Sequence, residues 1–128
     1  MTSTSRSFVE HRDRIAKLAG ALQSLGVATG DRVGILSLNS DRYLELLYAI
    51  PWAGGVLNPV NVRWSVPEIT YSLDESQTTV LFVDDQFAPM IPALTEAYPD
   101  LTTIVFTGDG ERPEGMLDYE ELIAGADP

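Results

Sequence analysis

Arg63 is the side chain most suited by its position to bind a ligand, because it closes a turn that directly precedes the predicted start of a helix. A guanidinium in such a turn can pair with a phosphate group through parallel hydrogen bonds. The competing interpretation is an ion pair with one of the 19 acidic side chains, and residue type alone favours that interpretation. A binding role for Arg63 therefore needs support from beyond its residue type.

Two other patterns occur where nucleotide or metal sites are found, and both are incomplete. Gly108-Asp109-Gly110 follows a predicted strand, but it lacks the third glycine of a dinucleotide fingerprint and opens no helix, so we interpret it as a surface turn. Asp84-Asp85 also follows a predicted strand, where a phosphate-receiver domain would bind magnesium. The single lysine, Lys17, lies on the first predicted helix, however, so a helix cap in a solvated loop is the favoured interpretation.

Residue counts exclude several classes of catalytic site. The chain has no cysteine, which rules out disulfides, thiolate catalysis and cysteine-bound zinc. It has one histidine, so no histidine cluster can form. It also has neither a Gly-Lys-Ser/Thr loop for phosphates nor a Gly-X-Ser-X-Gly nucleophile elbow.

Composition narrows the class of protein and its partners. The 128 residues are 45% hydrophobic, so we expect one domain over 1–128, with residues 1–7 disordered. The net charge of −11 argues against nucleic acids and anionic membrane surfaces as partners. No apolar run is long enough to span a bilayer, and the polar start lacks a signal core. A soluble, cytoplasmic protein is the expectation.

The periodicity of apolar residues predicts the elements that must position these side chains. Strand candidates begin at Val33, Val56, Thr79 and Thr103, with helical patterns over 8–25, 41–53, 65–76, 90–98 and 118–124. A spacing of about 23 residues is typical of consecutive βαβ units. We therefore predict an α/β fold with three αβα layers and a mostly parallel sheet of about four short strands.

The joint between the second predicted helix and the second predicted strand is the central connection of this predicted fold. Gly54-Gly55 can end the helix with a positive φ, and Pro59 limits the strand to Val56 and Leu57. Pro51 predicts a kink or an early end of the helix. Its predicted apolar face is formed by Leu44, Leu47, Tyr48 and Ala53. The nearby aromatic residues are expected to pack between helices and sheet: Tyr43, Tyr48, Trp52, Trp64 and Tyr71.

Several ordered segments are similar to conserved blocks of the adenylate-forming, AMP-binding enzymes. These segments are residues 8–22, 25–33, 39–47, 53–63 and 68–76. The run from 8 to about 83 resembles acyl-CoA synthetases, particularly the fatty-acyl and aryl-acid CoA ligases, and residues 84–128 match more loosely. The resemblance implies that the fold is a piece of the large N-terminal domain of such enzymes.

The resemblance also implies an activity for the parent enzyme. Such enzymes use ATP, Mg²⁺ and coenzyme A to activate a carboxylic acid as an acyl-adenylate and transfer it to the coenzyme A thiol. A long-chain fatty acid is the expected substrate by likeness alone. In relatives, the arginine after this Asn-X pair approaches the phosphates of coenzyme A, which implies the same role for Arg63.

The chain departs from the family by lacking its reaction centre. It has no Ser/Thr/Gly-rich loop ending in Pro-Lys-Gly, no Tyr-Gly-X-Thr-Glu segment and no late catalytic lysine. We therefore expect an N-terminal fragment that is inactive and binds no cofactor alone. Its partners would be the remainder of the large domain and the C-terminal domain.

The alternative is a free-standing binding module of receiver or flavodoxin type. A fragment should expose a sheet edge and an apolar patch, and it should self-associate through them, whereas a self-contained module should not.

Overall fold

The computed structural model describes residues 8–37, 41–60, 63–108, 113 and 115–125. Residues 1–7, for which we predicted disorder, lie outside this part. The elements in chain order are α1 (Phe8–Ser24), β1 (Arg32–Leu36), α2 (Asp41–Trp52), β2 (Val56–Pro59), α3 (Val66–Ser76), β3 (Val80–Val83), the 3₁₀ turn η1 (Ala88–Met90), α4 (Ile91–Ala97), β4 (Thr103–Phe106), β5 (Leu117–Asp118) and α5 (Tyr119–Ala124).

The strands form one sheet in the order β2-β1-β3-β4-β5, and every pairing is parallel. The α/β fold class is therefore confirmed. The four predicted strands are present, and β5 adds a fifth that we did not predict. Since β5 has only two residues, it is too short to show any alternation of apolar and polar side chains.

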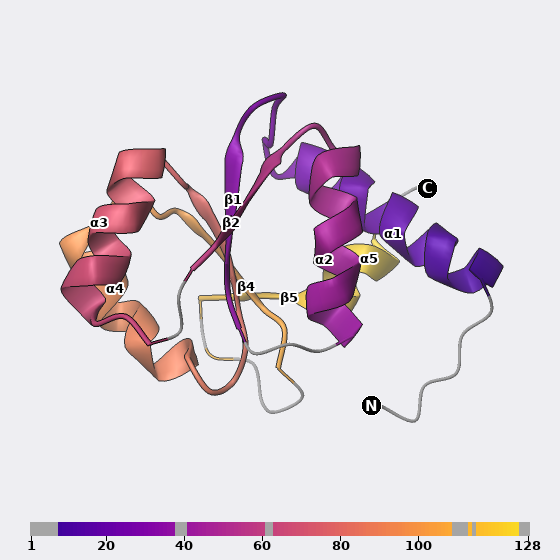
Figure 1. The fold of residues 1–128 in the computed structure, drawn as a ribbon. Helices are drawn as coiled ribbons and strands as arrows, with labels where there is room; N and C mark the ends of the chain where they lie inside the picture. Colours follow the sequence, from indigo (N-terminus) through magenta and orange to yellow (C-terminus); the bar gives the residue numbers. More distant parts are fainter. Residues whose placement is uncertain (1–7, 38–40, 61–62, 109–112, 114, 126–128) are drawn as a thin grey trace.

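Helices cover both faces of the sheet, which gives the three expected layers. Figure 1 shows α1, α2 and α5 on one side of the strands and α3 and α4 on the other. The first side holds one hydrophobic cluster and the second side another. Helices α2, α3 and α4 lie between β1 and β2, β2 and β3, and β3 and β4, the usual form of the crossover between parallel strands.

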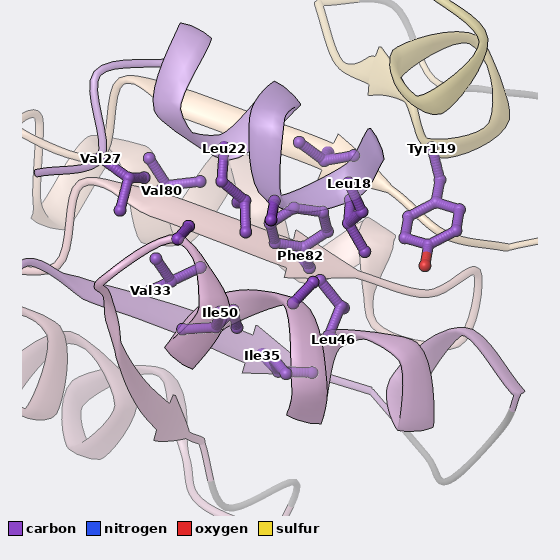
Figure 2. Close-up of a cluster of buried hydrophobic side chains, with 14 of the residues drawn as sticks. Leu18, Leu22, Val27, Val33, Ile35, Leu46, Ile50, Val80, Phe82 and Tyr119 are labelled. Atoms are coloured by element: carbon purple, nitrogen blue, oxygen red, sulfur yellow. The ribbon is translucent and has the colours of Figure 1, made fainter. Parts of the chain in front are cut away.

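Side chains of successive strand residues enter the two clusters alternately. Val33, Ile35 and Phe82 point toward α1 and α2, as Figure 2 shows, and all three are buried. Leu36 and Leu81 belong to the cluster under α3 and α4. This period of two on strands buried on both faces explains why they read as continuous apolar runs in the sequence.

The joint between α2 and β2 has the predicted glycine turn. Gly54 has a φ of +92°, a conformation that costs a residue with a Cβ about 1–2 kcal/mol. Gly55 has an ordinary φ, and its amide donates to the carbonyl of Ile50 at 2.9 Å. Our limit on the strand was too strict: β2 continues to Pro59, because an edge strand tolerates proline in its last position.

Our predicted apolar face of α2 was wrong for Leu44 and Tyr48, whereas Ala53 is buried as predicted. Leu44 and Tyr48 are 45% and 60% exposed, whereas Leu46, Ala49 and Ile50 face the core. The helix carries apolar residues all round, so periodicity alone could not select the buried side.

The predicted packing of the aromatic residues holds for two of the five. Tyr43 and Trp64 are half-buried against the core. Trp52 and Tyr71 are 55% and 69% exposed, and Tyr48 is exposed on α2. The exposed three therefore do not act as packing between helices and sheet in this structure.

Candidate functional site at the carboxyl edge of the sheet

The carboxyl ends of the parallel strands meet along one edge, where open α/β sheets bind ligands. The direction in which the chain adds strands reverses between β1 and β3, so this pair forms the topological switch point. Ser37 follows β1 and Asp84 follows β3 at that point. We therefore take this edge as the candidate site.

Ser37 and Asp84 meet at the switch point. The Ser37 hydroxyl donates to Oδ2 of Asp84 at 3.2 Å. The other carboxylate oxygen of Asp84 accepts from the amides of Gln86 and Phe87 at 3.1 and 3.2 Å. This geometry caps a turn that leads into η1, whereas η1 itself has no side-chain cap, so Asp84 lies in a capped turn and is not the helix cap that we predicted. In the described part of the chain, no group of acidic or histidine side chains is arranged to hold a metal ion.

Arg42 ties the start of α2 to the end of β4. Its Nη1 donates to the carbonyl of Thr107 at 2.8 Å and to that of Gly108 at 3.4 Å. Its guanidinium also lies 5.6 Å from the ring centroid of Tyr119 and donates to Glu120 at 3.2 Å. Arg42 thus fixes the backbone beside the candidate site and is not oriented as a phosphate ligand.

A partly buried ionic network joins α1, α2 and α5. Arg14 donates two hydrogen bonds to Glu45, at 2.6 and 3.0 Å, and two to Glu120, both at 2.9 Å. Tyr119 donates to Glu45 at 2.7 Å. Hydrogen bonds to Glu120 and then to Glu45 raise the pKa of Arg14, and burial raises the pKa of Tyr119. The carboxylate of Glu45 therefore has charged and neutral donors inside the protein.

The network makes stability depend on pH through Glu120. Its hydrogen bond from Arg14 lowers its pKa below the ordinary 4.5, so the unfolded chain binds more protons than the folded chain in that range. The contribution is present above pH 4.5 and is lost as the pH falls through the folded pKa. We expect the free energy of unfolding, measured with urea, to fall less steeply with decreasing pH in Glu120→Gln than in the parent. Glu121→Gln is the control. Equal pH slopes in all three proteins would contradict this.

Arg63, the site residue predicted from the sequence, lies in the turn between β2 and α3. It is exposed and precedes Ser65, the N-cap of α3. A capping box is present: Glu68 accepts from the Ser65 amide at 3.0 Å, and the Ser65 hydroxyl accepts from the Glu68 amide. Because the turn follows the end of β2, Arg63 is on the same edge as Ser37 and Asp84.

The glycine pattern after β4 is only partly within the described residues. Asp109 and Gly110 lie outside them. Gly108 approaches Asp85 so closely that an added Cβ would lie 2.8 Å from the Asp85 amide nitrogen. A hollow beside this contact, on the α4 side, is lined mainly by apolar side chains: Ala88, Ile91, Leu101, Ile104, Phe106 and Met116. Its lining can take an apolar group and offers little for phosphate.

Sequence reasoning missed Arg42 and the Arg14–Glu45–Glu120 network. The partners are 31 and 106 residues from Arg14 along the chain, so no local spacing connects them. The one available signal was Glu45, a carboxylate within the apolar residues of α2. A charge in such a position is expected to be paired if that side of the helix is buried.

The strand order alone is shared with flavodoxin-like folds, so comparison with known proteins decides the family. The family model described as AMP-binding enzyme matches residues 1–127. A long-chain-fatty-acid–CoA ligase of Thermus thermophilus is 37% identical over 123 residues, 95% of this chain and 23% of the relative. A feruloyl-CoA synthase of an Amycolatopsis species is 40% identical over 91 residues, 71% of this chain and 18% of the relative.

The fold comparison agrees with the sequence comparison. The crystal structure of the anthranilate CoA ligase AuaEII with anthranoyl-AMP matches with a TM-score of 0.86 and 29% identity. The match covers 93% of this chain and 23% of that one. This chain thus spans about a quarter or less of the length of the proteins it matches. By sequence and by fold, the chain belongs to the AMP-binding enzyme family.

Proposed function

We propose that this chain forms the first part of the large domain of an ATP-dependent acid–CoA ligase. In that reaction an acid carboxylate attacks the α-phosphorus of ATP, which releases pyrophosphate and forms an acyl-adenylate. The thiol of coenzyme A, losing its proton, then attacks the acyl carbon, and AMP leaves. The observation that carries the proposal is the family match over residues 1–127 together with the fold match to a CoA ligase.

The described residues do not by themselves fit ATP and Mg²⁺. Arg42 is bound to backbone carbonyls, and Lys17 lies in the middle of α1. Asp84 uses its oxygens on Ser37 and on backbone amides. Stabilising charge on a transferred phosphate requires several donors aimed at one place. We therefore propose that ATP and Mg²⁺ are held by other parts of the enzyme, and that the 128-residue chain alone is inactive.

The proposed role of this chain is structural support plus one contact to coenzyme A. Arg63 is an exposed cation on the carboxyl edge, and a guanidinium suits the phosphates of coenzyme A. A fatty acid is the proposed acyl substrate. The relatives above are named for a long-chain fatty acid and for ferulate, so the acid is the least constrained part of the proposal. A cytoplasmic location remains a prediction, and among the described residues no helix is long and apolar enough to cross a membrane.

The contact to coenzyme A is testable in the full-length enzyme, meaning the polypeptide encoded by the complete reading frame that contains this chain. Arg63→Ala should raise the KM for coenzyme A about tenfold, the effect of losing one charge-assisted hydrogen bond of about 1.4 kcal/mol. The acid-dependent exchange of pyrophosphate into ATP, which needs no coenzyme A, should stay unchanged. Arg32→Ala is the matched control, since Arg32 is an exposed arginine at the opposite end of β1. An unchanged KM in Arg63→Ala would refute the contact.

A further inference from the structure

The outer face of α2 carries a line of large hydrophobic side chains. Leu44, Tyr48 and Trp52 are spaced four residues apart, so they lie one above another along the helix. They are 45%, 60% and 55% exposed, and Val56 at the start of the edge strand β2 is 43% exposed. We call Leu44, Tyr48 and Trp52 the α2 stripe.

Both the inner and the outer face of α2 carry apolar side chains. Leu46, Ala49 and Ile50 face the core, and the α2 stripe faces outward. Glu45 is turned inward as well and is 2% exposed. The outer face of α1, in contrast, has the charged residues Arg12 and Asp13. A helix that is hydrophobic on all sides is normally enclosed in the core of a larger protein.

We infer that the α2 stripe is an internal packing surface, covered by an apolar face of the same polypeptide beyond residue 128. This inference rests on the proposed function. The relatives are at least four times longer than the part that matches, so most of the enzyme is available to cover the stripe. An uncharged stripe fits an uncharged helix or sheet face, because burying a charge there without a partner is costly.

Two other partners that could cover the α2 stripe fit the observations less well. A second copy of the chain, the partner that we expected from the sequence, would bring together two chains that each carry a net charge of −11. An anionic lipid surface would be repelled by the same charge. Dimerisation of the short chain is a distinguishable outcome of the experiment below.

Hydroxyl-radical footprinting can compare the stripe in the 128-residue chain and in the full-length enzyme. With an added dosimeter for normalisation, Tyr48 and Trp52 should be oxidised readily in the short chain. In the full-length enzyme their oxidation should fall to the level of Tyr119, which is 1% exposed. Equal oxidation of Tyr48 and Trp52 in both proteins would overturn the inference. So would a short chain that is dimeric by light scattering with its stripe already protected.

A pair of variants gives a second readout that does not depend on activity. Tyr48→Glu should leave the unfolding midpoint of the short chain nearly unchanged, because the site is exposed there, and should cause loss of soluble full-length enzyme. Ala93→Glu, on the exposed side of α4, is the matched control. Equal effects of Tyr48→Glu in the two proteins would contradict the inference. A full-length enzyme whose α2 stripe is protected but which does not exchange pyrophosphate would instead refute only the proposed function.

Discussion

Arg14→Met is expected to lower the free energy of unfolding by about 3–5 kcal/mol, the cost of leaving a buried charge without its partner. Glu45 is 2% exposed and receives two of its hydrogen bonds from Arg14. Methionine keeps most of the aliphatic length of arginine but supplies no donor, so only the Tyr119 hydroxyl would still donate to Glu45 among the contacts described. Urea unfolding followed by circular dichroism measures the loss.

The double variant Arg14→Met/Glu45→Leu separates pairing from packing. Removing both charges takes away the unpaired carboxylate, so we expect it to recover most of the lost stability. Lys17→Met, one turn further along α1, is the control for the change of residue type. A double variant no more stable than Arg14→Met alone would show that the ion pair is not the reason for the loss.

Gly108→Ala is expected to lower the free energy of unfolding by about 1–3 kcal/mol, the usual penalty for forcing an extra group into a packed site. The new Cβ would lie 2.8 Å from both the amide nitrogen and the Cβ of Asp85, and 2.6 Å from the ring of Phe106. Relief requires the backbone after β3 or β4 to move. Arg42 resists this movement because it holds the carbonyls of Thr107 and Gly108.

Gly125→Ala is the matched control for that substitution. Gly125 has an ordinary negative φ, and an added Cβ would lie 3.4 Å from the carbonyl of Glu121, close to a normal contact. Its effect on the free energy of unfolding should be within about 0.5 kcal/mol. If both glycine variants lose the same stability, close approach at Gly108 is not the cause.

The sheet was predictable because its residues carry a local signal. Strands β1 and β3 are buried on both faces, so Val33 and Phe82 stand in unbroken apolar runs. The cap at Ser65 was predictable for the same reason, since its partner Glu68 is three residues away.

Features that depend on the rest of the molecule were not predictable. The buried side of α2 could not be chosen, because both Ile50 and Tyr48 stand at helical spacing and only the fold decides between them. The pairing of Arg14 with Glu120 spans 106 residues. Arg63 was singled out from its turn and from resemblance, and its contact with coenzyme A stays a prediction.

We propose that this chain belongs to a ligase that makes an acyl-adenylate. The most direct measurement is exchange of labelled pyrophosphate into ATP by the full-length enzyme, with and without a panel of fatty and aromatic acids. We expect exchange that requires an acid and Mg²⁺ and that is absent from the 128-residue chain. Folded full-length enzyme with no acid-dependent exchange, or exchange catalysed by the 128-residue chain alone, would contradict it.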